Sequence, residues 1–177
     1  MASSPSNNES ILRLHSGAPL LNKVSVLILG EYGINKKKLA ESLVSMSDKF
    51  PLLVRLTSNL PLEPTDPPRP RIDFICFVID VTRKESLNCL QEAVKFIDAE
   101  YFLGRACLIV HLPDNHRKMS TIEIESIKDI AKMYNLITIY GNIETRANHV
   151  SCQILRIVEI SAGFKSNLQS IFLLALT

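Results

Sequence analysis

Residues 72–81 restrict the fold of this chain more than any other segment. They read Ile-Asp-Phe-Ile-Cys-Phe-Val-Ile-Asp-Val and are rich in β-branched and aromatic side chains, which strands favour. A nearly continuous apolar run of this length is typical of a strand that is covered by other elements on both faces. We therefore predict a strand at the centre of a buried sheet.

Apolar runs and helix-period segments alternate along the rest of the chain. Further strands are predicted at residues 24–29, 52–57, 106–110 and 136–140. Helices are predicted at 36–46, after a capping box at 82–85, after a second capping box at 120–123, and through 150–158. Strands that alternate with helices indicate right-handed βαβ crossovers, so we expect an α/β fold with a mainly parallel sheet and helices on both faces.

The chain is predicted to form one domain with a flexible tail. Residues 1–22 are rich in serine and asparagine and show no sustained period, so we expect them to add little to the core. The remaining residues, 23–177, suffice for one sizeable core and are too few for two ordinary domains. Residues 61–70 hold five of the nine prolines and are predicted to be a stiff, extended connection.

The loop after the first predicted strand lies where a phosphate-binding P-loop would lie. That motif, G-x-x-x-x-G-K-[ST], wraps phosphates in backbone N–H groups. Gly30 and Lys36 have the required separation, but Asn35 replaces the second glycine and Lys37 replaces the hydroxyl residue that would bind Mg²⁺. We favour a simple turn that leads into a solvated lysine run at residues 36–38.

The other parts of a GTPase site are also missing. The chain contains no D-x-x-G turn, and the guanine-reading N-K-x-D becomes His-Leu-Pro-Asp at residues 111–114. Only Asp114 is kept, and residues 140–142 do not resemble the last guanine-contacting loop. A divergent small GTPase or a nucleotide-binding regulator therefore remains only as the alternative to a nucleotide-independent protein.

Other chemistry is sparse in the sequence. His111, His116 and Asp114 are interpreted as a polar loop, and the four histidines lack the spacing of metal ligands. No nucleophile elbow or Cys–His signature is present, although a catalytic group assembled from distant residues would leave no such trace. We predict that the chain is not an enzyme and has no cofactor or metal.

Charge and cysteine usage narrow the class of protein. The 20 Lys and Arg nearly balance the 18 Asp and Glu, whereas a nucleic-acid binder usually has a concentrated basic excess, so no direct nucleic-acid binding is expected. Cysteines at 76, 89, 107 and 152 lack the spacing of a disulfide framework and are interpreted as reduced core residues of an intracellular protein. No segment has the features of a secretion signal or the length of a membrane span, so no membrane association is expected.

Three blocks of sequence resemble one known family. They are Arg-Pro-Arg-Ile-Asp-Phe-Ile-Cys-Phe-Val-Ile at 69–79, Ser-Leu at 86–87, and Ile-Asp-Ala-Glu-Tyr-Phe-Leu-Gly at 97–104. In content and spacing these blocks resemble the centromere protein M family of the vertebrate kinetochore. A weaker likeness covers nearly the whole chain beyond the tail, while the extended N-terminus and the C-terminal ending depart from the family.

The resemblance implies both a fold and a role. It implies a small-GTPase-like (Ras-like) three-layer domain that does not bind nucleotide. It also implies a subunit of the inner kinetochore's constitutive network in the nucleus, which assembles with centromere proteins H, I and K at centromeres and supports chromosome segregation.

A scaffold subunit needs a surface that buries apolar area on a partner, and two segments offer one. The first is Tyr101, Phe102 and Leu103, three large apolar residues in succession between a helix and a strand. The second includes Leu168, Ile171 and Phe172 near the C-terminus. Alternatively, two of the first three side chains fill the domain core and the second segment is a helix packed on the sheet. Leu103 and Ile171 are the residues that we expect to face a partner.

Overall fold

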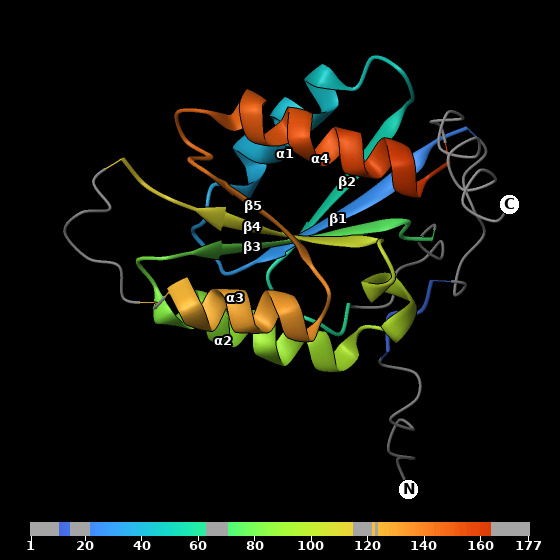
Figure 1. The fold of residues 1–177 in the computed structure, drawn as a ribbon. Coiled ribbons are helices and arrows are strands. Elements are labelled where there is room, and N and C mark those ends of the chain that lie inside the picture. The colour runs from blue at the N-terminus through green and yellow to red at the C-terminus, as the bar shows by residue number, and fades with distance from the viewer. Residues whose placement is uncertain (1–10, 15–21, 63–70, 115–121, 123, 164–177) are drawn as a thin grey trace, which may run out of the picture.

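The fold is an α/β sandwich with a central sheet, seen in a computed structural model (Figure 1). The structure describes residues 11–14, 22–62, 71–114, 122 and 124–163. In chain order the elements are β1 (Val24–Gly30), α1 (Lys36–Met46), β2 (Leu52–Thr57), β3 (Phe74–Asp80), α2 (Lys84–Ala93), the 3₁₀ turns η1 (Val94–Phe96) and η2 (Ala99–Phe102), β4 (Ala106–His111), α3 (Ile124–Met133), β5 (Ile137–Gly141) and α4 (Ala147–Ser161).

The sheet is entirely parallel, and its five strands lie in the order β2-β1-β3-β4-β5. Figure 1 shows α1 and α4 on one face of the sheet and α2 and α3 on the other. This arrangement confirms the predicted three-layer α/β fold, which is consistent with the Ras-like class. The apolar run that begins at Ile72 supplies β3, the middle strand, as predicted.

Two apolar cores lie on opposite faces of the sheet because neighbouring residues of a strand point to opposite sides. Every residue of β1, β3 and β4 is buried, whereas the edge strands β2 and β5 are partly exposed. Along β3, Ile75, Phe77 and Ile79 belong to the core under α2 and α3. Phe74, Cys76 and Val78 belong to the core under α1 and α4. A continuous apolar run is the sequence pattern that such two-sided burial requires.

Of the four free cysteines, Cys76 and Cys107 are buried in the core, as predicted, whereas Cys89 and Cys152 are only half-buried. Cys76 and Cys107 pair in register across β3 and β4, and their sulfur atoms lie 3.7 Å apart as a thiol hydrogen bond. Burial raises the pKa of the Cys76 thiol well above its usual value, and the neighbouring Cys107 adds to the effect. Both side chains therefore act as small apolar core residues.

Part of the predicted N-terminal tail contributes to the core, which corrects the expectation for residues 11–14. Leu12 forms a parallel bridge with Ile97: its N–H donates to Phe96 O at 2.7 Å, and its carbonyl accepts from Asp98 N–H at 3.0 Å. Leu14 is only 6% exposed and joins the core under α2 and α3. A short apolar pair inside a polar segment has no period, so the sequence pattern did not reveal it.

The first predicted capping box does not form. Helix α2 begins at Lys84, and no side chain caps its first turn. The hydroxyl of Thr82 instead donates to Asp80 Oδ1 at 2.7 Å, because that carboxylate lies at the end of β3 and competes for the hydroxyl. The second capping box, residues 120–123, lies almost wholly outside the described residues, as do residues 63–70 of the proline-rich connection.

Substitution of Leu14 by alanine tests whether this N-terminal residue stabilises the fold. We expect Leu14→Ala to lower the free energy of unfolding by about 2–3 kcal/mol, because it removes a buried side chain and leaves a cavity. Urea denaturation measures the change. Leu103→Ala is the matched control, since Leu103 is 80% exposed and its truncation is expected to change stability by less than about 0.5 kcal/mol. Equal effects of the two substitutions would contradict the packing of Leu14.

Candidate functional site

The carboxyl ends of β1 and β3 form the place where a sheet of this topology usually binds a ligand. The chain passes from β1 to β2 on one side and then returns to β3 on the other, so the strand order reverses between β1 and β3. Two glycines allow the loop after β1 to turn closely. A Cβ at Gly30 would lie 2.6 Å from the carbonyl oxygen of Val78, and Gly33 has a φ of +90°.

Lys36 occupies the position of the P-loop lysine, but its ammonium binds the protein itself. It donates to the carbonyl oxygens of Gly30 at 2.5 Å and Thr57 at 2.9 Å, and to Ser58 Oγ at 2.7 Å. Lys36 is only 8% exposed, so the prediction of a solvated lysine run is wrong for this residue. Burial lowers its pKa, and the charges of Cys89 and Glu31 oppose that shift. This lysine ties β1 to the end of β2 and does not reach toward a ligand.

Arg83 closes the crevice between the loops after β1 and β3. Its guanidinium donates to Tyr32 O at 3.3 Å and lies 3.9 Å from Glu31 Oε1. A Cβ at Gly33 would lie 3.1 Å from Arg83 Nη1, so the guanidinium rests against the turn itself. Sequence reasoning missed this residue, because nothing in its local pattern shows that it reaches across to another loop.

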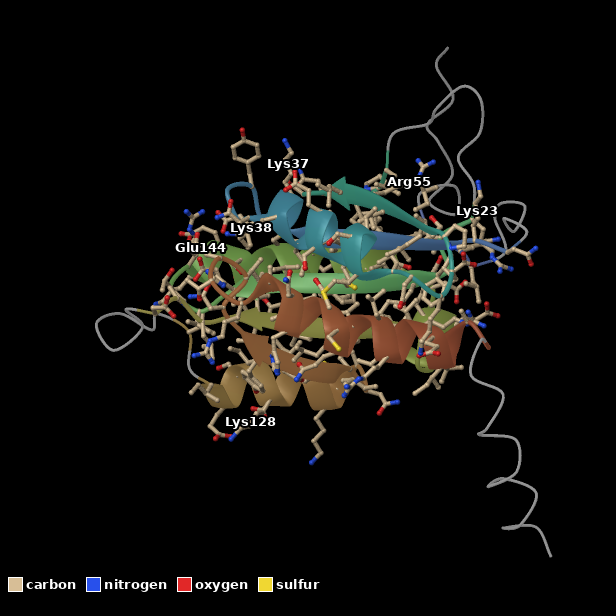
Figure 2. All side chains as sticks on the ribbon, turned by 90° about the horizontal axis from the view of Figure 1, so that it is seen from above. Lys23, Lys37, Lys38, Arg55, Lys128 and Glu144 are labelled. Carbon is tan, nitrogen blue, oxygen red and sulfur yellow. The ribbon has the colours of Figure 1, made fainter. Side chains whose placement is uncertain are left out.

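A second set of contacts joins the start of α1 to the loop after β5. Asn35 donates to Glu144 Oε1 at 2.7 Å, and Lys38 donates to the backbone carbonyl of Glu144 at 2.5 Å. Figure 2 shows Lys38 and Glu144 at the same end of the molecule, with Lys37 above them. The residue that replaces the second P-loop glycine thus serves as an interloop contact.

The loops after β4 and β5 are also held by their own polar groups. His111 is buried, and its Nδ1 accepts a hydrogen bond from Ile143 N–H at 3.1 Å. The interpretation of His111 as part of a polar loop with Asp114 and His116 is therefore wrong; His116 lies outside the described residues. Asn142 Oδ1 accepts from the N–H groups of Glu144 at 2.7 Å and Thr145 at 3.1 Å. These side chains fix loops and do not face an open site.

Around the loop after β1, the described polar side chains are bound by the protein itself. Lys36, Arg83 and the side-chain amide of Asn35 each donate to a neighbouring protein oxygen. Across the described residues, no group of three or more His, Cys, Asp and Glu side chains gathers as metal ligands would. None of the described helices combines the length and hydropathy that a membrane span needs.

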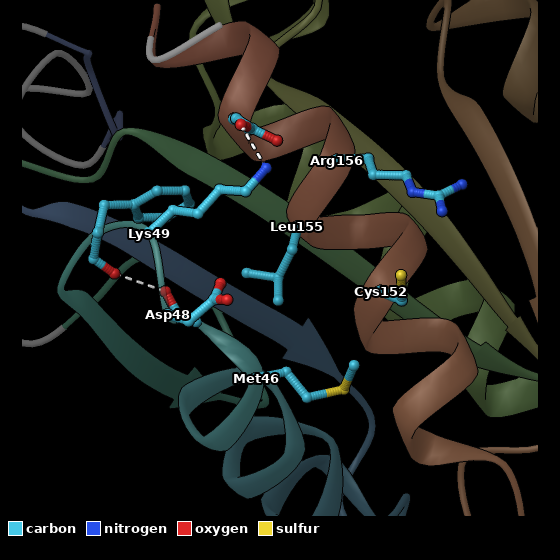
Figure 3. Close-up of a pocket in the computed structure, with 9 residues that line it drawn as sticks. Met46, Asp48, Lys49, Cys152, Leu155 and Arg156 are labelled. Carbon is cyan, nitrogen blue, oxygen red and sulfur yellow. Dashed lines mark hydrogen bonds and ion pairs between the residues drawn. The ribbon is translucent and has the colours of Figure 1, made fainter.

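A surface cavity of about 160 Å³ lies between the end of α1 and the second half of α4 (Figure 3). Met46, Cys152 and Leu155 give it an apolar lining. At its rim Lys49 donates to Glu159 Oε1 at 2.8 Å, and this contact raises the pKa of Lys49. The cavity therefore combines an apolar lining with an ion pair at its rim.

Comparisons with known proteins agree with the resemblance found in the sequence. The profile of the family described as centromere protein M (CENP-M) matches residues 9–177. Centromere protein M of Homo sapiens is 29% identical over 169 residues, which cover 94% of this chain and 93% of the human protein. Centromere protein M of Danio rerio is 30% identical over 159 residues, which cover 87% of this chain and 84% of that protein.

The chain belongs to the centromere protein M family. It is thus a centromere protein, and the family match begins at residue 9, before the segment of the tail that packs on the core. The relatives' names assign no reaction to the family.

In this centromere protein M family member, the three residues of the first predicted partner-binding segment differ in how far they are exposed. Tyr101 is fully buried, and its hydroxyl donates to Ile72 O at 2.8 Å, so it is a core residue and has no surface to offer a partner. Phe102 is half-buried and packs against Phe77 and Tyr134, with ring centroids 6.4 Å and 5.2 Å apart. Only Leu103, which is 80% exposed, points away from the domain.

The second predicted partner-binding segment, with Leu168, Ile171 and Phe172, lies outside the described residues. Its role remains a prediction.

Substitution of Lys36 tests whether its ammonium is structural. We expect Lys36→Met to lower the free energy of unfolding by about 1–3 kcal/mol, because it leaves buried oxygen acceptors without a donor. Lys37→Met is the matched control: Lys37 lies on the same helix, its side chain is 85% exposed, and its loss is expected to change stability by less than about 0.5 kcal/mol. Chemical denaturation of both variants makes the comparison, and an unchanged stability of Lys36→Met would refute the structural role.

Proposed function

We propose that this chain is a non-catalytic pseudo-GTPase that serves as a structural subunit of the inner kinetochore. In this proposal it resides at centromeres in the nucleus and assembles with centromere proteins H, I and K to support kinetochore assembly and chromosome segregation. Family membership supports the centromeric role. The observation that carries the non-catalytic part is the internal use of Lys36, whose ammonium is bound by three protein oxygens where a P-loop lysine would bind phosphate.

Loss of nucleotide binding has a direct physical basis at this edge of the sheet. A phosphate group that approached the loop after β1 would have to displace Arg83 from Tyr32 and Lys36 from its three acceptors. Each displaced contact leaves a polar group to be satisfied again, which costs free energy. The sequence offers no hydroxyl at position 37 to hold the Mg²⁺ that would offset this cost.

The exposed Leu103 supports a role in protein assembly, because its side chain extends from a well-anchored turn. Asp98 Oδ1 caps η2 by accepting from Glu100 N–H at 3.1 Å, and Tyr101 fixes the turn to the core through its hydroxyl. Leu103 and Gly104, whose φ is +87°, complete the turn. An apolar side chain on a rigid support loses little conformational freedom on binding, which favours its use as an anchor for a partner.

Thermal unfolding with nucleotide tests the first half of the proposal. We expect no change in midpoint when millimolar GTP or GDP with Mg²⁺ is added to the full chain. A ligand present at one hundred times its dissociation constant would stabilise the native state by about 2.7 kcal/mol, so even a weak site would be detected. A Mg²⁺-dependent rise in the midpoint would instead favour the alternative, a divergent GTPase or nucleotide-binding regulator.

Substitution of the apolar Leu103 by a charged residue tests the second half of the proposal, the role in assembly. We expect Leu103→Glu to weaken assembly with centromere proteins H, I and K at least about tenfold, because a buried carboxylate without a partner is costly at an interface. Size-exclusion chromatography of the mixed proteins, followed by titration, measures the loss.

Met133→Glu is the control for this substitution. Met133 is 71% exposed at the end of α3, so Met133→Glu introduces the same charge at an apolar surface residue of another element. Both variants should fold with unchanged far-UV circular dichroism. If Leu103→Glu assembled normally, the proposal that Leu103 lies in the interface would be refuted.

A further inference from the structure

A polar cavity of about 200 Å³ lies at the amino ends of the strands, away from the degenerate nucleotide site. Its lining includes Lys23 just before β1, Arg71 and Asp73 just before β3, and Arg105 just before β4. Figure 2 shows Lys23 at the opposite end of the molecule from Lys38 and Glu144. In a parallel sheet the residues that precede neighbouring strands meet at one edge, which is why segments far apart in sequence converge here.

Arg71 is held in place by a buried carboxylate. Its Nε and Nη2 lie 2.8 Å and 2.7 Å from Asp73 Oδ1, and its side chain is 25% exposed. Asp73 is itself fixed, because its Oδ2 accepts a hydrogen bond from Ser25 N–H at 2.9 Å. Both contacts of the guanidinium use one edge of its fork, so the Nη1 group and its remaining donors are left for a ligand. The arginine is thus oriented before any ligand arrives.

The side chains of two further cations in the cavity are unpaired among the described residues. Neither Lys23 nor Arg105 makes a side-chain hydrogen bond or an ion pair within the part of the chain that the structure describes. Arg105 is half-buried, and its backbone is fixed by hydrogen bonds with Tyr101 O at 2.9 Å and Ile75 N–H at 2.9 Å. Arg105 lines the same cavity as Arg71, so an anion bound there would be attracted by both guanidinium groups.

The charge of the lining indicates which anion fits. Lys23, Arg71 and Arg105 carry three positive charges and Asp73 one negative charge, which leaves two positive charges in the cavity. A phosphate monoester carries a charge of about −1.5 to −2 near neutral pH and offers three strong acceptor oxygens. We propose that this cavity binds a phosphorylated serine or threonine side chain of a protein partner.

The shape of the site favours a single side chain over a nucleic acid or a nucleotide. The cations converge on one cavity and do not form an extended basic stripe, and the whole chain has a net charge of only +2. The lining residues include no aromatic ring on which a base could stack. The planar guanidinium of an arginine can donate two parallel hydrogen bonds to two oxygen atoms of a phosphate, which suits binding of a single phosphate group.

The site extends the proposed function without depending on it. Arg105 lies two residues after the exposed Leu103, so one partner segment that contacts this corner of the domain can place an apolar residue and a phosphate side by side. Phosphate binding can nevertheless be measured on the chain alone. If the chain did not bind phosphate, the proposed assembly role would still stand. If Leu103 were not needed for assembly, the proposed phosphate site would still stand.

Peptide titration of the full chain tests the proposal. The probe is an acetylated and amidated Gly-Gly-phosphoserine-Gly-Gly peptide, and the readout is the saturable shift of backbone amide signals in two-dimensional NMR. We expect shifts at residues 71–73 and at Arg105, and none with the unphosphorylated peptide. Arg105→Gln should weaken binding about tenfold or more, because it removes charge-assisted hydrogen bonds.

Matched variants and competing ligands complete the test. Arg146→Gln removes the same charge from an exposed arginine at the other end of the sheet and should leave binding unchanged. Lys23→Gln changes an exposed residue, keeps the fold, and should also weaken binding. The proposal is overturned if Arg105→Gln and Lys23→Gln bind like the wild type, or if a glutamate peptide binds as tightly as phosphoserine. It is equally overturned if inorganic phosphate or a short DNA duplex binds more tightly than the phosphopeptide.

Discussion

Burial of the three central strands on both faces is the constraint on which the rest of this structure depends. Strands β1, β3 and β4 expose none of their residues, so each is apolar along most of its length and is covered above and below. That need places α1 and α4 on one face and α2 and α3 on the other. It also brings all the loops to the two ends of the sheet, where polar groups are found.

The two ends differ in how their polar groups are used. At the carboxyl end, Lys36 and Arg83 bind backbone carbonyls and close the crevice in which doubly wound sheets usually hold a ligand. At the amino end, Arg71 is oriented by Asp73, while the guanidinium of Arg105 has no hydrogen bond or ion pair in the described part of the chain. The polar side chains at the carboxyl end are therefore bound by the protein itself, whereas the amino end keeps a cation without a side-chain partner among the described residues.

Much of the fold could be predicted because buried strands and amphipathic helices leave periodic patterns in a sequence. The central position of β3, the parallel sheet and the bounds of α1 followed from such patterns. The predictions failed for two different reasons. Thr82 was expected to cap a helix, but Asp80, two residues earlier, competes for its hydroxyl. Leu14 was assigned to a flexible tail but packs on a core that distant segments form, and no local pattern records that contact.

The sequence by itself determined the α/β class, the loss of the P-loop residues and the likeness to the centromere protein M family. These depend on residue types at short, fixed spacings. Only the tertiary structure decided what the remaining polar residues do, because chain segments up to about a hundred residues apart meet at the ends of a parallel sheet. It thus showed that Lys36 is structural, that Leu103 and not Tyr101 is exposed, and that Lys23, Arg71 and Arg105 share one cavity.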